Sequence, residues 1–324
     1  MSVAVALLTV YIIWGSTYLA IAYVVETLPP FLAAGARFVA AGGLILGFIA
    51  AQAASRRNRP GGGRIPLPRA IEWRTALIVG ALLLLGGNGM VMVAEQTVPS
   101  GIAAVIIATV PIWMSVFDAL LTRRAPSRLA IGGLLVGLAG VAILLVPTEG
   151  SVEIDPFGIG VLVVATISWA AGSLYARHGP LPKHPLLGTG MEQLAGGATL
   201  LAVGLLVGEL WRLDPATVSS ESLVALAYLI VFGSLLGFTA YVWLLAHAPV
   251  TTVATYAYVN PVVAVALGMF FREEQLSLRT MVAAALIIGA VVAMVSGRPR
   301  EAEEPGPSPD SAPLESADDA TEAA

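Results

Sequence analysis

The sequence predicts an all-α polytopic membrane protein with ten transmembrane helices, arranged as two inverted five-helix repeats. Three observations predict this fold: the composition is strongly apolar, the chain divides into ten apolar segments, and its halves share a pattern of Gly, Pro and Trp. Only 12% of the 324 residues are charged, about half the share in soluble domains. Mean hydropathy is +0.85. A soluble enzyme and a nucleic-acid-binding protein are therefore excluded.

A transmembrane helix needs about 20 mostly apolar residues to cross the hydrocarbon core. Loops between the apolar segments are short, and many carry proline. The ten segments run over 3–25, 31–52, 73–94, 100–121, 129–146, 157–175, 187–208, 222–245, 250–271 and 279–296.

Residues 297–324 differ from the rest of the chain. This tail contains two Arg, eight acidic residues and five Pro, so it contributes −6 to the net charge of −4. It carries too little apolar surface to fold, and we expect a disordered acidic cytoplasmic tail.

Basic residues predict the orientation, because cytoplasmic loops are enriched in Lys and Arg. With the N-terminus inside, thirteen basic residues fall on the cytoplasmic side: Arg56, Arg57, Arg59, Arg64, Arg69, Arg74, Arg123, Arg124, Arg128, Arg177, Lys183, Arg298 and Arg300. Only Arg212, Arg272 and Arg279 fall outside. Both termini are therefore predicted to be cytoplasmic.

The two halves align in two constant registers. Four pairs stand 155 residues apart: Trp14 with Trp169, Pro30 with Pro185, Gly35 with Gly190, and Arg37 with Glu192. Four more stand 150 apart: Gly87 with Gly237, Pro99 with Pro249, Pro111 with Pro261, and Ser127 with Ser277. The predicted repeats are 3–146 and 150–296. Each has five spans, and since five is odd, the second repeat must be inverted.

Inverted repeats are a recurrent construction of secondary transporters, whose binding site lies near the midplane between the repeats. Pro111 and Pro261 interrupt helices at matching positions, where each removes a backbone hydrogen bond. We predict a helix break or gate at these two prolines.

Arg37 and Glu192 lie well inside predicted spans, where charge is costly. Arg37 lies about 10 Å below the outer face and Glu192 at the equivalent depth below the inner face. Arg37 is expected to attract a carboxylate. Glu192 is expected to pair with an amine or carry a proton. The alternatives are that Arg37 snorkels and that Glu192 bonds a neighbouring helix end.

Other polar and aromatic residues within the spans complete the predicted substrate site. Small and hydroxylated residues of this kind also serve helix packing, which is the alternative for Ser16 and Thr17. Asn88 lies among Gly86, Gly87 and Gly89, which let a neighbour approach closely. The full predicted set is Trp14, Ser16, Thr17, Tyr18, Arg37, Asn88, Trp113, Trp169, Glu192, Tyr241, Tyr256, Tyr258 and Asn260. The GxxxG pairs Gly43/Gly47, Gly133/Gly137, Gly204/Gly208 and Gly233/Gly237 are expected to pack within the bundle.

Enzyme and metal signatures are absent from the sequence. It has no Cys, no HExxH, no GxSxG and no phosphate loop. The three His (His178, His184 and His247) fall in predicted loops. We expect no catalytic residues, no metal and no cofactor.

Three groups of residues carry a family resemblance. They are Gly15-Ser16-Thr17-Tyr18 with Ala34-Gly35-Ala36-Arg37-Phe38, Gly87-Asn88-Gly89 with Val98-Pro99-Ser100-Gly101-Ile102-Ala103-Ala104, and Tyr256-Ala257-Tyr258-Val259-Asn260-Pro261. Together they resemble the EamA family of the drug/metabolite transporter superfamily, in its YedA-like bacterial branch. The resemblance implies a ten-helix inner-membrane permease that exports amino acids and related metabolites. EamA repeats place a Glu before the last helix: Glu273-Glu274 matches this, whereas Arg123-Arg124 stands at the first-half position.

The main functional hypothesis is therefore a secondary transporter or facilitator that exports small metabolites, amino acids among them, by alternating access. Its expected partners are a small-molecule substrate and the lipid bilayer, with protons as a further hypothesis through Glu192. The chain is expected to act as a monomer or homodimer. The alternative is a membrane receptor or assembly protein that binds a small ligand without moving it. An intramembrane enzyme has almost no residue support.

Overall fold

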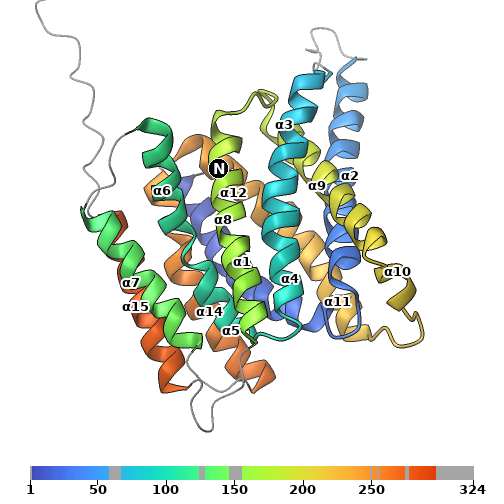
Figure 1. Ribbon diagram of the computed structural model, residues 1–324. Coiled ribbons are helices and arrows are strands. Elements are labelled where there is room, and N and C mark those ends of the chain that lie inside the picture. Colours follow the sequence, from blue (N-terminus) through green and yellow to red (C-terminus); the bar gives the residue numbers. More distant parts are fainter. Residues whose placement is uncertain are drawn as a thin grey trace, which may run out of the picture.

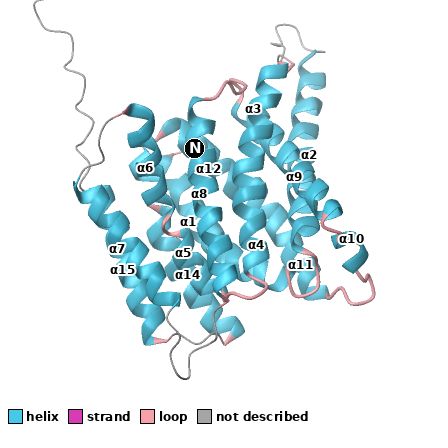
Figure 2. Cartoon of the chain, viewed as in Figure 1, coloured by secondary structure: helices cyan, strands magenta, loops and turns pink. Residues whose placement is uncertain are grey.

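The computed structural model describes residues 2–57, 67–123, 128–145, 155–248, 250–253, 255–273 and 277–296. Within these ranges the chain is nearly all helical and contains no strand (Figure 2). The helices are α1 (Val3–Val24), α2 (Pro30–Arg57), α3 (Ala70–Gly80), α4 (Met90–Ala94), α5 (Ser100–Ile107), α6 (Val110–Thr122), α7 (Arg128–Leu145), α8 (Pro156–His178), α9 (Pro185–Leu206), α10 (Glu209–Arg212), α11 (Ser220–Tyr228), α12 (Thr239–His247), α13 (Val250–Val253), α14 (Tyr256–Arg272) and α15 (Leu278–Ser296). The predicted acidic tail lies outside the described residues.

Six helical segments in the described ranges are long and apolar enough to cross a membrane. They are Val3–Val24, Pro30–Ser55, Ala70–Ala94, Ser100–Leu121, Pro156–His178 and Ser220–His247, and Val259–Arg272 and Leu278–Ala290 are shorter apolar helices. The fold is therefore that of a polytopic helical membrane protein. Helices α7 and α9 also cover most of the predicted ranges 129–146 and 187–208, to Leu145 and Leu206.

Two π-helical stretches interrupt the α-helices. The first, η1 (Ala81–Gly89), joins α3 to α4, and the second, η2 (Leu229–Phe238), joins α11 to α12. Their first residues stand 148 positions apart and their last residues 149, close to the 150-residue register of the sequence. A π-helical turn leaves backbone groups free for other partners and is frequent at functional sites.

Two helix ends also match in this register. Arg123 follows α6 and Glu273 follows α14, and both adopt the left-handed region with φ of 53°. Non-glycine residues seldom take this conformation. These two residues are 150 positions apart, so the same backbone turn recurs although the side chains have opposite charge.

The helices of the two halves pack in a reciprocal pattern (Figure 1). α2 lies along α9, and α7 lies along α15. α1, from the first half, packs against α11, η2, α12 and α14 of the second, whereas α8 packs against η1, α4, α5 and α6 of the first. The first helix of each half therefore packs against elements of the other half, and the boundary between the halves runs through the centre of the molecule.

Glycines bring α2 and α9 close together. A Cβ on Gly42 would lie 2.5 Å from the backbone nitrogen of Leu194, and one on Gly197 would lie 2.6 Å from that of Val39. The expectation for the Gly43/Gly47 pair is wrong, because no atom lies within 4 Å of a Cβ built at either residue. In contrast, Cβ atoms at Gly137, Gly204, Gly233 and Gly237 would meet side chains of other helices.

A buried carboxylate fixes the start of α2. Glu209, in the short helix α10, accepts hydrogen bonds from the backbone nitrogens of Phe31 at 3.1 Å and Leu32 at 2.8 Å. The first amides of a helix lack intrahelical partners and attract negative charge. Glu209 thereby ties α10 to the end of α2 that carries Pro30. In the turn between α1 and α2, Glu26 pairs with Arg272, the last residue of α14, at 2.6 Å.

Candidate functional site

A pocket lies where the two halves meet, with about 600 Å³ of empty space when the part open to its surroundings is counted. Helices α1, α2, α4 and α5 and stretch η1 contribute its first-half wall, and α8, η2 and α14 contribute its second-half wall. The lining residues are Trp14, Thr17, Tyr18, Ile21, Arg37, Phe38, Gly87, Asn88, Val91, Ile107, Ala165, Trp169, Gly233, Phe238, Tyr256 and Asn260. Apolar and aromatic surfaces with a few polar groups are typical of small-molecule sites.

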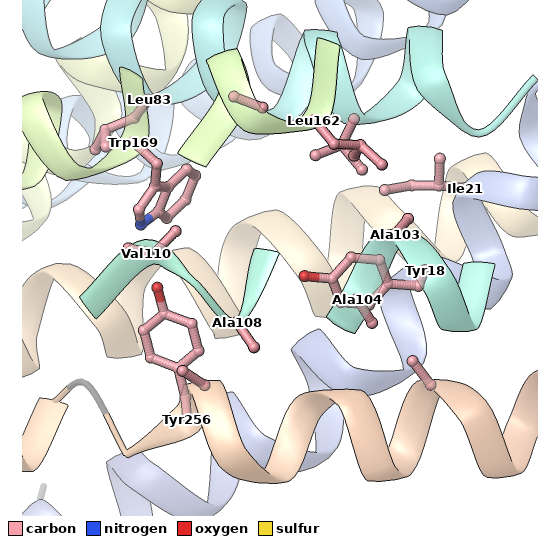
Figure 3. Close-up of a cluster of buried hydrophobic side chains, with 14 of the residues drawn as sticks. Tyr18, Ile21, Leu83, Ala103, Ala104, Ala108, Val110, Leu162, Trp169 and Tyr256 are labelled. Atoms are coloured by element: carbon pink, nitrogen blue, oxygen red, sulfur yellow. The ribbon is translucent and has the colours of Figure 1, made fainter. Parts of the chain in front are cut away.

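Four aromatic rings form a cluster beside the pocket. Trp14 contacts Trp169 edge-on at 5.4 Å between centroids, and it contacts Tyr241 at 4.8 Å and Tyr256 at 5.6 Å. Figure 3 shows Trp169 on α8 and Tyr256 on α14 pointing toward one another. Since α1 and α14 come from opposite halves, the cluster spans the boundary between the halves. It lies at the Trp14 end of the pocket, which extends along α1 to Ile21, about 10 Å away.

Hydrogen bonds hold this cluster in place. Trp169 Nε1 donates to the Tyr241 hydroxyl at 3.2 Å, and that hydroxyl is 2.8 Å from Ser173 Oγ. Trp14 Nε1 donates to the carbonyl of Gly233, in η2, at 3.3 Å. The indole and phenol groups thereby satisfy their polar ends while their rings remain packed.

The glycines around Asn88 let α8 approach η1 closely. A Cβ on Gly87 would lie 2.7 Å from Trp169 Cε3, and one on Gly86 would lie 2.9 Å from Ser168 Cβ. Ser168 Oγ donates to the carbonyl of Leu82, in η1, at 2.8 Å. The predicted close approach at these glycines is thus present, and the neighbour is the helix that carries Trp169.

Arg37 is buried and lines the pocket. Its Nε donates to Ser234 Oγ, in η2, at 2.7 Å. A Cβ on Gly233 would lie 2.7 Å from its Nη2, so the guanidinium lies against the backbone of η2. Nη1 has no hydrogen-bond partner among the described residues, and no described carboxylate pairs with Arg37. Arg37 therefore does not snorkel to the surface, and it keeps a donor for a ligand.

Asn260 is a second buried polar residue with an acceptor that no hydrogen bond uses. It lines the pocket from α14, and its Oδ1 has no partner among the described residues. A buried unpaired amide oxygen is costly unless a ligand or water supplies the bond. Two residues of the wall therefore carry a buried polar atom without a partner among the described residues: a donor of Arg37 in the first half and an acceptor of Asn260 in the second.

The two prolines differ in their local structure. Pro111 occupies the first turn of α6, directly after the break between α5 and α6 at Ala108 and Thr109. At this position its missing amide costs nothing. The prediction that Pro111 removes a bond within a helix is therefore wrong. Pro261 does lie inside α14. The helical break between α5 and α6 lies directly before Pro111, whereas the break before α14 lies at Thr255, one turn or more before Pro261.

The pocket wall includes eight of the predicted substrate residues: Trp14, Thr17, Tyr18, Arg37, Asn88, Trp169, Tyr256 and Asn260. Ser16, Trp113, Glu192 and Tyr241 lie outside it. Ser16 Oγ is 2.6 Å from the Tyr228 hydroxyl and Trp113 packs against the apolar core, whereas Tyr241 supports Trp169. Glu192 is fully buried on α9 and pairs with no described side chain. The side chain of Tyr258 is outside the described part of the structure.

Sequence reasoning missed the apolar wall and one polar residue. Phe38, Val91, Ile107 and Phe238 resemble any core residue in sequence, so no signal marks them. Ser234 positions Arg37, and a hydroxyl within an apolar span could have drawn attention to it. No group of three potential metal ligands occurs among the described residues.

The model of the EamA-like transporter family matches residues 1–146 and 156–296. The chain belongs to this family. The inner membrane transporter YedA of Escherichia coli K12 is 39% identical over 294 residues, which cover 90% of each chain. Protein PecM of Dickeya dadantii is 27% identical over 286 residues, covering 86% of this chain and 88% of PecM.

Other similar proteins are more distant. The chloroplastic WAT1-related protein At3g02690 of Arabidopsis thaliana is 25% identical over 88% of this chain and 67% of its own. A crystal structure that covers 90% of this chain and 96% of its own superimposes with a TM-score of 0.60 at 20% identity, so it shares the fold. The family and the apolar spans together identify a multi-pass inner-membrane transporter, and the predicted resemblance is confirmed.

Proposed function

We propose that this EamA protein is a secondary carrier that exports small amphipathic metabolites, amino acids among them, across the inner membrane by alternating access. The observation that carries the proposal is the pocket between the halves, two of whose lining residues, Arg37 and Asn260, each have a polar atom without a partner among the described residues. A substrate that contacts both walls bridges the surfaces that must separate during transport.

The proposed architecture has ten membrane helices in two inverted repeats, 3–146 and 150–296, with both termini and the tail 297–324 in the cytoplasm. The matched π-helical stretches, the matched left-handed residues Arg123 and Glu273, and the reciprocal packing of α1 and α8 support it. In this orientation the pocket extends from the midplane toward the outer face. The aromatic cluster then closes the cytoplasmic side.

In the proposed cycle, the halves rock about the packed pair α2 and α9. The cluster of Trp14, Trp169, Tyr241 and Tyr256 parts to admit substrate from the cytoplasm, because its rings come from both halves. The interruptions before Pro111 and Pro261 provide hinge points in α5–α6 and α13–α14.

The polar groups of the wall favour a substrate with a carboxylate. Arg37 presents a charged donor with no protein counter-ion in the described residues, and Asn260 presents an acceptor for an amine or hydroxyl. The rings of Trp14, Trp169 and Tyr256 favour an apolar or aromatic side chain. An amino acid with an apolar side chain meets all three requirements.

Uptake into proteoliposomes tests this proposal. A panel of labelled amino acids, with tryptophan and leucine as apolar members and glutamate and lysine as charged members, should give saturable flux for the apolar members. Asn260→Ala and Asn88→Ala should reduce that flux. Gly43→Ala, which faces open space, is the matched control. Absence of flux for every member would contradict the proposed substrate class.

The alternative, a receptor that binds a ligand without moving it, predicts a different result. It predicts ligand-induced thermal stabilisation of the purified protein with no flux in the same liposomes. Flux and stabilisation by the same amino acid would exclude it. An intramembrane enzyme would instead convert the ligand, which mass spectrometry of the recovered amino acid would reveal.

A further inference from the structure

Arg37 and Glu192 occupy matching positions of the proposed repeats, 155 residues apart, but only one of them has a partner. Both are buried, Arg37 to 2% exposure and Glu192 to 0%. Arg37 bonds Ser234 in the π-helical stretch of the opposite half. Neither oxygen of Glu192 has a hydrogen-bond partner among the described residues.

The structure gives the cause of this difference. In the 150-residue register, Ser234 of η2 corresponds to Leu84 of η1. Leu84 packs on α9 one turn from Glu192: a Cβ on Gly196 would lie 2.7 Å from its Cδ1. Gly80 lies against the backbone carbonyl of Glu192 itself. A fully buried apolar side chain therefore stands at the position whose counterpart holds a hydroxyl.

Among the side chains that the structure describes, the elements packed against α9 supply no cation to Glu192. Stretch η1 has no titratable residue. On α2, Arg37 is bonded to Ser234, and the side chains of Arg56 and Arg57, at the last two positions of the helix, lie outside the described part of the structure. On α3, Glu72 pairs with Arg69, and both Glu72 and Arg74 precede Gly80, the residue that lies against Glu192, by six or more residues.

The remaining elements packed against α9 are α10 and α12. On α10, Glu209 caps α2, and Arg212 is exposed. On α12, Tyr241 lies within electrostatic reach of Glu192, and His247 is exposed at the helix end.

Tyr241 links Glu192 to the pocket. Its hydroxyl accepts from Trp169 Nε1, and Trp169 lines the pocket wall. Tyr241 also belongs to the aromatic cluster that spans both halves. A change in the charge of Glu192 therefore acts electrostatically on one of the rings that must separate during transport.

An ionised carboxylate without donors is costly in a site of this kind, whereas the neutral acid is tolerated. We propose that Glu192 carries the coupling proton of the transport cycle, an inference that rests on the proposed carrier function. The carboxylate takes a proton from water when the cycle exposes it on one side. The neutral acid then enters the buried conformation seen here, and the proton leaves to water on the other side.

Infrared difference spectroscopy of the full-length protein tests the protonation directly and needs no substrate. Spectra of the wild type between acid and alkaline pH should contain a carboxylic-acid carbonyl band that Glu192→Gln removes and that Glu95→Gln, a control at another buried carboxyl, retains. If Glu192→Gln leaves every such band unchanged, Glu192 does not exchange protons and the proposal is overturned, whether or not the protein transports amino acids.

Flux measurements with labelled tryptophan test the coupling. With the membrane potential clamped to zero, a gradient of one pH unit should sustain about a tenfold tryptophan gradient in the wild type for one proton per substrate. Glu192→Gln should abolish this accumulation but retain tryptophan counterflow, which needs no net proton movement. Equal accumulation in both proteins would overturn the proposal. If the wild type showed tryptophan counterflow but no accumulation driven by the pH gradient, the proposed proton coupling would be overturned and the proposed carrier function would stand.

A matched pair of substitutions at Leu84 gives an independent test. Leu84→Ser restores the hydroxyl found in the other half, and Leu84→Ala opens a similar space without a hydroxyl. A donor stabilises the ionised carboxylate, so Leu84→Ser should move the pH midpoint of the infrared band to lower pH than Leu84→Ala. Coincident midpoints in these two variants would contradict the role assigned to Leu84.

Discussion

Arg37 Nε donates to Ser234 Oγ at 2.7 Å across the boundary between the two halves of the chain. The bond joins α2 to a π-helical stretch, and it leaves Nη1 of this pocket-lining residue without a partner among the described residues. The same backbone stretch accepts from Trp14 Nε1 and from Gln193 Nε2, at the carbonyls of Gly233 and Ser234. Stretch η2 therefore organises the charged part of the site.

Ser234→Ala should weaken binding of a carboxylate substrate without removing the charge. Hydrogen bonds to charged groups contribute about 1.5–3 kcal/mol, so we expect about a tenfold or larger rise in the half-saturating concentration of tryptophan. Arg37→Gln should in addition remove the preference for tryptophan over tryptophanamide, which lacks the carboxylate. Competition of the two compounds in uptake measures this preference. An unchanged preference would show that Arg37 does not bind the carboxylate.

Gly87→Ala should disturb the pocket. The new methyl group would lie 2.7 Å from Trp169 Cε3, so the indole must move or η1 must separate from α8. Overpacking of this kind costs about 1–3 kcal/mol. Gly43→Ala meets no atom within 4 Å and should be neutral or stabilising by about 0.4–1 kcal/mol. Thermal unfolding in detergent compares the two. Equal midpoints would mean that η1 and α8 are not in close contact.

Glu209→Ala should destabilise the end of α2 near Pro30. It removes two hydrogen bonds to the backbone amides of Phe31 and Leu32 and a negative charge from a helix N-terminus. Loss of a cap costs about 0.5–2 kcal/mol, so the unfolding midpoint should fall. Glu221→Ala, at an exposed residue in the first turn of α11, is the control and should change stability little. A fall of equal size in the control would argue against the capping role.

Because the chain has no Cys, single-cysteine labelling can test the proposed orientation. Ala216→Cys lies in the exposed loop between α10 and α11, and Lys183→Cys in the loop between α8 and α9. A membrane-impermeant maleimide should label Ala216→Cys in intact cells and Lys183→Cys only after permeabilisation. The opposite result would invert the orientation, and labelling of both in intact cells would contradict the inverted repeat.

Several parts of the fold followed from the sequence because hydrocarbon imposes a simple requirement. Long apolar segments must be helical, and short proline-containing loops must separate them. The same requirement made Arg37 and Asn88 conspicuous, since polar groups are rare in such segments. Both line the pocket.

Other features depend on side-chain packing, which the pattern of residue types does not encode. Gly43 and Gly47 have the spacing of a helix-packing motif, yet no neighbouring atom lies within 4 Å of a Cβ built at either residue. The π-helical backbone of η1 and η2 and the bond from Arg37 to Ser234 depend on how helices of opposite halves meet. Glu192 has the sequence signature of a ligand contact, but it lies on α9, and no residue of α9 lines the pocket.

Counterflow in proteoliposomes tests the central claim, that the pocket between the halves carries substrate across the membrane. Vesicles loaded with unlabelled tryptophan should transiently accumulate labelled tryptophan through the wild type and the Gly43→Ala control. Arg37→Gln and Asn260→Ala, which remove the free donor and acceptor of the two walls, should each lower the initial rate about tenfold or more. Wild-type protein that binds tryptophan saturably but shows no counterflow would contradict the carrier account.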